Sequence, residues 1–199
     1  KLSAGSTHVI VDLPWGPQGK LKTLAEASAL ARLFETVGNA LGLIVQALPT
    51  DGSAPIGRGI GPALEVQDVR RVLAGDPLAP CDLRDKALDF AARILAWDPA
   101  LATPQAGRAR AEQLLQSGAA LEKFEQIVDA QGRRQPAVVP SALTHAVRAR
   151  TALRVAQLNI AQISEVARRA GAPLDPSAGI QLAAGVGDVL APGALLYTI

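Results

Sequence analysis

The sequence predicts an α/β fold made of the tail of a mostly parallel α/β sheet domain (residues 1–135) and a small, half-barrel-like α+β domain (residues 141–199). Three observations support this prediction. Near the start, two short apolar runs flank a stretch with helical periodicity. The composition then shifts over residues 132–140 (GRRQPAVVP), after a series of helical patterns. Beyond it, short runs alternate with Gly-Asp and Pro-Gly pairs, which are typical of turns between short strands.

The first part begins with a strand, a helix and a second strand. Residues 9–13 and 43–48 are short, apolar and rich in β-branched side chains, as buried strands are. Between them, apolar residues recur every three or four positions over 24–37, and Thr23 and Glu26 stand where a capping box requires them. Gly38 and Gly42 are expected to end this helix. This order predicts a βαβ unit, in which the two strands run parallel.

Helical periodicity continues through the rest of the first part. Pro62 suits the first turn of a helix, and further helices are predicted over residues 82–97, 104–117 and 119–131. Asp82, Thr103 and Ser117 are the candidate N-caps of these three helices. In the second part, we expect strands over 144–150 and 153–158, a helix over 160–171, and short strands over 179–199.

Composition excludes several classes of protein. Hydrophobic residues make up 49% of the 199 residues, too many for a disordered chain, and no apolar run is long enough to cross a bilayer. With 20 basic and 18 acidic residues and only 3% aromatic residues, we expect neither a nucleic-acid partner nor a membrane partner. The single cysteine, Cys81, fits a reducing compartment, and we expect a cytoplasmic protein. No methionine is present, even at position 1, so we expect part of a longer chain.

The loop after each predicted strand is a candidate binding site, because ligands of open α/β sheets lie at the carboxyl ends of the strands. In the first loop, residues 14–20, glycines allow close backbone approach, and Lys20 precedes a helix N-terminus where it can hold an anion. The alternative is an ordinary turn with a surface lysine. The second loop, residues 51–61, contains four glycines. Its carbonyls can ligate a hard cation if Asp68 or Glu65 supplies a carboxylate.

The alternative for the second loop is that Arg58 pairs with an acidic side chain and that the glycines only allow a tight path. His8 and His145 lack partners at metal-ligand spacing, so we interpret both as structural or solvated. Cys81 precedes a helix without a histidine nearby in sequence, which favours a simple structural role.

Three stretches in the same order resemble the thymidine phosphorylase and AMP phosphorylase family. They are residues 1–20 (KLSAGSTHVIVDLPWGPQGK), residues 51–66 (DGSAPIGRGIGPALEV) and residues 179–199, which include Val-Gly-Asp-Val-Leu and Leu-Tyr-Thr-Ile. The likeness covers essentially the whole chain and corresponds to the C-terminal portion of the family. It is greatest to the subgroup that holds the archaeal AMP phosphorylases and the bacterial type 2 thymidine phosphorylases.

The resemblance implies a pentosyltransferase that catalyses reversible phosphorolysis of thymidine to thymine and 2-deoxyribose 1-phosphate. Inorganic phosphate is then the co-substrate, no organic cofactor is needed, K⁺ is a candidate bound ion, and a homodimer is expected. Thymidine is preferred because an Ala- and Arg-rich composition without Met suggests a high-GC bacterium. The alternatives are an AMP phosphorylase, which releases adenine and ribose 1,5-bisphosphate, and a non-catalytic, carrier-like module. Residues 179–199 lack the lysine that a carrier needs.

The resemblance also assigns roles to a few residues. Lys20 resembles the lysine that contacts the nucleotide in the AMP phosphorylase subgroup. Ile56 and Gly59 resemble positions whose backbone carbonyls bind a monovalent cation in pyrimidine nucleoside phosphorylases, and Asp68 stands where that site usually has Glu. The family's phosphate loop, base-contacting residues and proton-donor aspartate precede the stretch that matches this chain. No catalytic residue is therefore expected in it, and the isolated chain is expected to be inactive.

Overall fold

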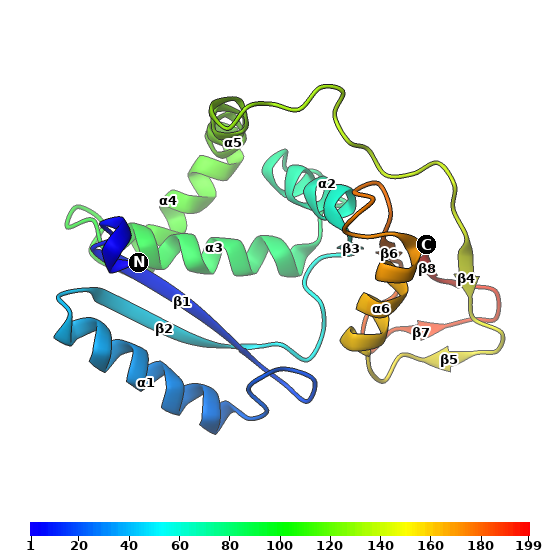
Figure 1. The fold of residues 1–199 in the computed structure, drawn as a ribbon, viewed down its shortest axis with the longest axis horizontal. Coiled ribbons are helices and arrows are strands. Elements are labelled where there is room, and N and C mark those ends of the chain that lie inside the picture. Colours follow the sequence, from blue (N-terminus) through cyan, green and yellow to red (C-terminus); the bar gives the residue numbers. More distant parts are fainter. The chain divides into compact units, whose positions relative to one another are not determined.

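The computed structural model describes residues 1–199 and shows a mixed α/β fold with six α-helices and small sheets (Figure 1). The predicted α/β class is confirmed. Packing divides the chain into two units, residues 1–55 and 56–199. The domain boundary expected between residues 135 and 141 stays a prediction. None of the helices combines the length and the apolar character needed to cross a membrane.

The first unit contains the predicted βαβ motif. Its elements are a 3₁₀ helix (Leu2–Ala4), β1 (His8–Trp15), α1 (Leu24–Ala40) and β2 (Ile44–Asp51). The strands β1 and β2 run parallel, with His8 opposite Ile44 and Trp15 opposite Asp51. The capping box is present as predicted, since the Thr23 hydroxyl accepts from the Glu26 amide and the Glu26 carboxylate accepts from the Thr23 amide.

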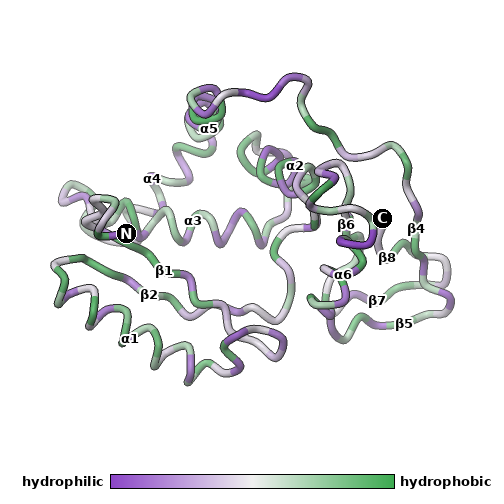
Figure 2. Tube along the Cα trace, viewed as in Figure 1, coloured by the Kyte–Doolittle hydropathy of each residue, from purple (hydrophilic) through white to green (hydrophobic).

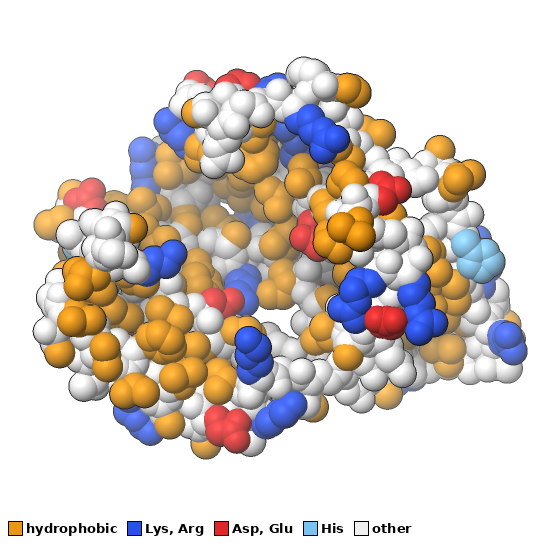
Figure 3. Space-filling view, in the orientation of Figure 1, with side chains coloured by type: hydrophobic (Ala, Val, Ile, Leu, Met, Phe, Trp, Pro, Cys, Tyr) orange, Lys and Arg blue, Asp and Glu red, His pale blue; other side chains and the backbone are white.

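Helix α1 packs on one face of the two-stranded sheet. Leu13, Ala31 and Ala47 form the buried centre of this contact. Gly38 was expected to end this helix, but the helix continues through it to Ala40. The glycine allows close packing, because a Cβ at this position would overlap the Val45 side chain of β2. Hydrophobic positions recur along the trace of α1 (Figure 2), and hydrophobic side chains lie on the surface of this unit (Figure 3). Several large ones remain exposed. They are Leu2, Leu24, Leu33, Phe34, Val37, Leu41 and Ile44.

Five helices form in the second unit, close to the predicted ranges. They are α2 (Pro62–Leu73), α3 (Cys81–Leu95), α4 (Pro104–Gln116), α5 (Ala119–Ala130) and α6 (Ile160–Ala170). Thr103 caps α4 as predicted, because its hydroxyl accepts from the Ala106 amide. Two cap predictions are wrong. Pro80 is the N-cap of α3, which places Asp82 in the first turn, and Gly118, in a left-handed conformation with φ 80°, is the N-cap of α5 in place of Ser117.

The strands of the second unit are short and antiparallel. They are β3 (Gly59–Ile60), β4 (Ala146–Arg148), β5 (Leu153–Arg154), β6 (Ile180–Leu182), β7 (Val189–Leu190) and β8 (Leu195–Thr198). One sheet has the order β3-β6-β8-β4, and β5 pairs with β7. Helix α6 packs on the larger sheet, where Ala167, Ala172, Ile180 and Leu182 are buried together. The only parallel strand pair is therefore β1–β2 in the first unit.

Strand β3 is the element that the sequence did not reveal. The prediction placed residues 51–61 in a glycine-rich loop, whereas Gly59 and Ile60 pair with Gln181 and Ile180 of β6. Gly59 allows this because a Cβ at that position would lie 2.6 Å from the backbone of Leu64. The glycine-rich segment is thus joined to the C-terminal sheet.

The contact between α3 and α4 depends on Gly107. A Cβ at this position would overlap the carbonyl oxygen of Ala92, which is backbone and cannot rotate away. Gly→Ala inside a helix ordinarily stabilises by about 0.5–1 kcal/mol. We expect Gly107→Ala to destabilise by about 1–3 kcal/mol, because the helices must separate. Urea unfolding followed by circular dichroism measures the change.

Gly185→Ala is the matched control, because a Cβ at Gly185 meets nothing closer than the Asp188 carboxylate at 3.9 Å. Equal free energies of unfolding for the two variants would contradict the proposed role of Gly107.

Candidate functional site

The two loops that follow the parallel strands lie against each other. The Gly52 amide donates to the Trp15 carbonyl at 2.8 Å, and a Cβ on Gly16 would lie 3.0 Å from the backbone of Gly52. The carboxyl ends of β1 and β2 therefore meet as backbone against backbone. This is the place where open α/β sheets bind ligands.

Polar side chains lie at this end of the sheet. The Thr50 hydroxyl donates to the Asp12 carboxylate at 2.6 Å, across the two strands. The Asp51 carboxylate accepts from the Ser53 amide at 2.8 Å. The hydroxyl and the amide of Ser53 hold the pKa of the Asp51 carboxyl below its usual value, so Asp51 is anionic at neutral pH.

Lys20 and Lys22 differ in what they contact. The Lys22 ammonium donates to the Pro17 carbonyl at 3.2 Å, which fixes it against the first loop. Lys20 is exposed and makes no hydrogen bond or ion pair within the chain. Its ammonium is therefore available to an anion, as the predicted role requires, and that role stays a prediction.

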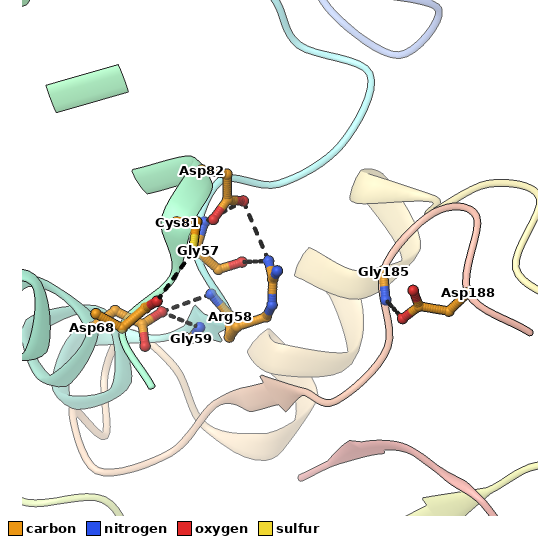
Figure 4. Close-up of polar contacts among 9 residues, drawn as sticks. Gly57, Arg58, Gly59, Asp68, Cys81, Asp82, Gly185 and Asp188 are labelled. Carbon is orange, nitrogen blue, oxygen red and sulfur yellow. Dashed lines mark hydrogen bonds and ion pairs between the residues drawn. The ribbon is translucent and has the colours of Figure 1, made fainter. Parts of the chain in front are cut away.

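The turn at residues 57–59 is built around the buried carboxylate of Asp68. This side chain, which comes from α2, is only 3% exposed, and its Oδ2 accepts from the amides of Arg58 and Gly59 at 2.6 and 2.7 Å (Figure 4). Gly57 has φ 78°, a conformation that favours glycine, and a Cβ there would lie 2.9 Å from the same oxygen. The turn and the carboxylate thus fit each other closely.

A second carboxylate, from Asp82 in the first turn of α3, also holds this turn. Its Oδ2 accepts from the Gly57 amide at 3.2 Å and from Arg58 Nη1 at 3.3 Å (Figure 4). The alternative interpretation of Arg58, as the partner of an acidic side chain, is therefore confirmed. Both side chains are about 40% exposed, so the ion pair itself contributes little to stability.

The predicted cation ligands can be tested against this geometry. Asp68 Oδ1 is buried and has no hydrogen-bond partner, which is costly for a carboxylate oxygen unless a cation or a donor satisfies it. Glu65, the other candidate, caps α2 by accepting from the Gly61 amide at 3.1 Å. Ile56 is exposed. Gly59 is buried in β3, and its amide donates to Asp68. The roles of Ile56, Gly59 and Asp68 as cation ligands stay a prediction.

The two histidines and the cysteine belong to no cluster of metal-ligating side chains. No group of three or more His, Cys, Asp or Glu side chains could hold a metal ion. The His8 ring contacts the Thr7 hydroxyl, and the backbone of His145 pairs with that of Ile199. Cys81 is exposed at the start of α3.

Known proteins resemble the chain over its full length. It is 57% identical over 199 residues to a protein of Azorhizobium caulinodans, and 56% identical to one of Cupriavidus necator, both named bifunctional ribose 1,5-bisphosphokinase-thymidine phosphorylase. It is 49% identical to a Nitrobacter hamburgensis protein that is provisionally named thymidine phosphorylase. The predicted resemblance to the thymidine phosphorylases is confirmed. No family model matches the chain.

The match covers all of this chain but only part of each relative. It spans 29% of the Azorhizobium protein, 33% of the Cupriavidus protein and 39% of the Nitrobacter protein. The thymidine phosphorylase names therefore belong to proteins about 2.6 to 3.4 times as long as the stretch that this chain matches. The activity in these names is therefore that of the longer proteins and is not shown for this chain alone.

Asp68 is expected to be the most important side chain of the turn for stability. Asp68→Ala removes the acceptor from the buried amide of Gly59 and the half-buried amide of Arg58, and a buried amide left unsatisfied costs about 1–3 kcal/mol. We expect Asp68→Asn to lose less, because the amide oxygen retains one acceptor. Chemical denaturation of the variants measures the difference in free energy of unfolding.

Asp85→Ala is a suitable control, since its carboxylate is 57% exposed on α3 and is expected to matter by less than about 0.5 kcal/mol. If Asp68→Ala unfolds at the same denaturant concentration as Asp85→Ala, the buried carboxylate does not hold the turn.

Proposed function

We propose that the protein to which this chain belongs catalyses the reversible phosphorolysis of thymidine to thymine and 2-deoxyribose 1-phosphate. The observation that carries the proposal is 49 to 57% identity over the entire chain to proteins named thymidine phosphorylase. Because the chain spans 39% or less of these relatives, the activity is proposed for the longer protein and not for residues 1–199 alone.

The reaction makes demands that this chain meets only in part. A phosphate oxygen attacks the anomeric carbon, the bond from that carbon to the base breaks, and the departing base takes up a proton. Phosphate must be held by cations or N–H donors while positive charge develops on the sugar. The contribution we propose for the chain is the exposed ammonium of Lys20 at the carboxyl ends of β1 and β2. Catalytic groups would come from the remainder of the protein.

An AMP phosphorylase is the second candidate, because of Lys20. The Lys20 ammonium has no partner within the chain and lies beside the carboxyl ends of the strands, so it can bind a 5′-phosphate. AMP carries this phosphate, and thymidine lacks it. The products would then be adenine and ribose 1,5-bisphosphate. The thymidine phosphorylase names of the relatives favour the first candidate.

A bound monovalent cation belongs to the same proposal. Asp68 Oδ1, which has no partner, would be the charged ligand, and the carbonyls of Ile56 and Gly59 would be neutral ligands. A single carboxylate with neutral oxygens suits an ion of low charge such as K⁺. Such an ion would fix the loop between β2 and α2. A homodimer, also proposed, rests on the resemblance alone.

The choice between the two substrates can be made with the full-length protein. We expect phosphate-dependent release of thymine from thymidine at a kcat/KM at least about 100-fold above that for release of adenine from AMP, a difference of about 2.7 kcal/mol in transition-state binding. Chromatography of the released bases measures both. A preference for AMP would overturn the first candidate.

The Lys20→Ala variant tests which phosphate group Lys20 holds. If Lys20 holds the inorganic phosphate, as in the first candidate, the variant loses activity toward both substrates. If Lys20 holds a 5′-phosphate, the variant loses activity toward AMP and keeps activity toward thymidine. Lys22→Ala is the matched control on the same loop, because the Lys22 ammonium is already bound to a carbonyl.

The cation can be tested without turnover. We expect K⁺ to raise the melting temperature of the full-length protein by a few degrees relative to Na⁺ or choline at equal ionic strength, because an ion that binds only the folded state stabilises it. In Asp68→Asn this difference is expected to vanish. An identical response to the three salts in the unaltered protein would contradict a K⁺ site.

A further inference from the structure

A groove opens in the second unit between α2, α5 and the segment 131–140. Its volume is about 900 Å³, which lies within the range of pockets that bind small organic molecules. Most of its lining is apolar and includes the side chains of Val66, Phe124, Val128, Val138 and Val139. Val66 is 47% exposed and Val139 is 66% exposed, so water reaches this surface. An exposed apolar hollow of this kind is a candidate binding site.

Two of the three adjacent arginine pairs of the chain line this groove. On α2, Arg70 and Arg71 stand on the same helical face as Val66, because residues three to five positions apart along a helix are neighbours on its surface. The second pair, residues 133–134, lies just after α5. Asp76 is the only acidic residue of the lining, so the lining carries an excess of positive charge.

Two of these arginines are held in place by carboxylates of α5. Arg70 Nη1 lies 2.7 Å from Glu125 Oε1, and Arg133 Nη2 donates to Glu125 Oε2 at 2.7 Å. Arg133 Nε also donates to Asp129 at 2.6 Å, and the Arg70 guanidinium lies 5.6 Å from the centre of the Phe124 ring. Arg133 and Arg70 hold the pKa of the Glu125 carboxyl below its usual value, so this partner stays charged. Because both arginines are ordered before a ligand arrives, little conformational entropy is lost when one binds.

The other two arginines are available to an anion. Arg71 has only Asp76 as a partner, with 4.0 Å between its Nε and the carboxylate oxygen, the limit of an ion pair. Arg134 is exposed and makes no hydrogen bond or ion pair within the chain. A planar guanidinium binds phosphate oxygens through two parallel N–H groups. Because both side chains line the groove, they can hold one anionic group together.

The ligand that fits carries both a charged group and a flat or apolar body. An inorganic anion alone would leave most of the groove and its apolar floor unoccupied. Two guanidiniums without firm partners suit a phosphate monoester, which carries up to two negative charges and three acceptor oxygens near neutral pH. Arg70, whose side chain is 44% exposed over the Phe124 ring, offers a planar surface on which an aromatic base can stack.

We propose that the groove binds a nucleoside 5′-monophosphate, with the phosphate on Arg71 and Arg134 and the base against Arg70 and the apolar floor. The proposal rests on the second unit alone and goes beyond the proposed function, which assigns no role to these arginines. A segment of the longer protein that filled the groove would exclude the nucleotide, so absence of binding is one of the outcomes that overturn the proposal.

The test is isothermal titration calorimetry of thymidine 5′-monophosphate into the full-length protein. The protein is first saturated with thymidine in the absence of phosphate, so that a nucleoside site is already occupied and no turnover takes place. We expect the nucleotide to bind under these conditions, and to bind more weakly as NaCl is added, because salt screens the arginines. Ribose 5-phosphate, which lacks the base, is expected to bind at least about 10-fold more weakly, because the stacking contact is lost.

The arginine variants locate the site. We expect Arg134→Ala and Arg71→Ala each to weaken nucleotide binding at least about 10-fold, because each removes charge-assisted hydrogen bonds to the phosphate. Arg134 has no contact within the chain to lose, so its substitution is not expected to affect folding. Arg169→Ala is the matched control from the third arginine pair, since its Nε donates to Glu165 at 2.9 Å and it does not line the groove. Its affinity is expected to stay within about twofold of the unaltered protein.

Four results would overturn the proposal. They are no binding of the nucleotide in the presence of thymidine, equally tight binding of ribose 5-phosphate, unchanged affinity in Arg134→Ala and Arg71→Ala, and an equal loss in Arg169→Ala, which would indicate general attraction to positive charge. A phosphorolysis assay on the same preparation keeps the two proposals apart. Active protein that does not bind the nucleotide rejects the groove alone, and nucleotide binding by a protein without phosphorolysis of thymidine rejects the function alone.

Discussion

The carboxylate of Asp68 is the constraint on which the second unit depends most. It is the only buried charged side chain, and it satisfies the amides of Arg58 and Gly59. By doing so it fixes the glycine turn against α2 and sets the course of β3, which pairs with β6 more than a hundred residues later in the chain. A single side chain thus joins a helix, a turn and a sheet. Asp82 supports the same turn from α3 through a more exposed contact.

The same carboxylate links the fold to the proposed chemistry. One of its oxygens is used by the backbone, while the other is buried and lacks a partner. A purely structural carboxylate would be expected to satisfy both oxygens, because an unsatisfied buried acceptor is costly. A cation bound by Asp68 and by carbonyls of the loop would remove this cost. The loop that would carry the ion follows β2, whose carboxyl end meets the loop that holds Lys20.

The first unit is a two-stranded parallel sheet with a helix packed on one face. Its two parallel strands are covered on one face by α1, and the Glu35 carboxylate of that helix accepts from the Ala47 amide of β2. The relatives are about 2.6 to 3.4 times as long as this chain, which spans 29 to 39% of their length. In the proposed function, the catalytic groups would come from the part of the longer protein that this chain does not match.

The sequence by itself determined the elements whose signals are local. Helix periodicity placed α1 to α6, the Thr23–Glu26 pair marked the start of α1, and apolar runs located β1 and β2. These signals are read within a few residues, because a helix or a cap is built from near neighbours. The resemblance to the thymidine phosphorylases also came from the sequence and was confirmed by the relatives.

Only the tertiary structure decided the contacts that join distant residues. Strand β3 is two residues long, too short for any periodic pattern, and it forms because Asp68 holds its amides and β6 offers a free edge. Asp82 looked like a helix cap, yet its carboxylate faces Gly57 and Arg58, which lie about 25 residues earlier. Which oxygen of Asp68 is left without a partner follows from geometry in three dimensions, because the direction of each backbone group around it is fixed by its neighbours.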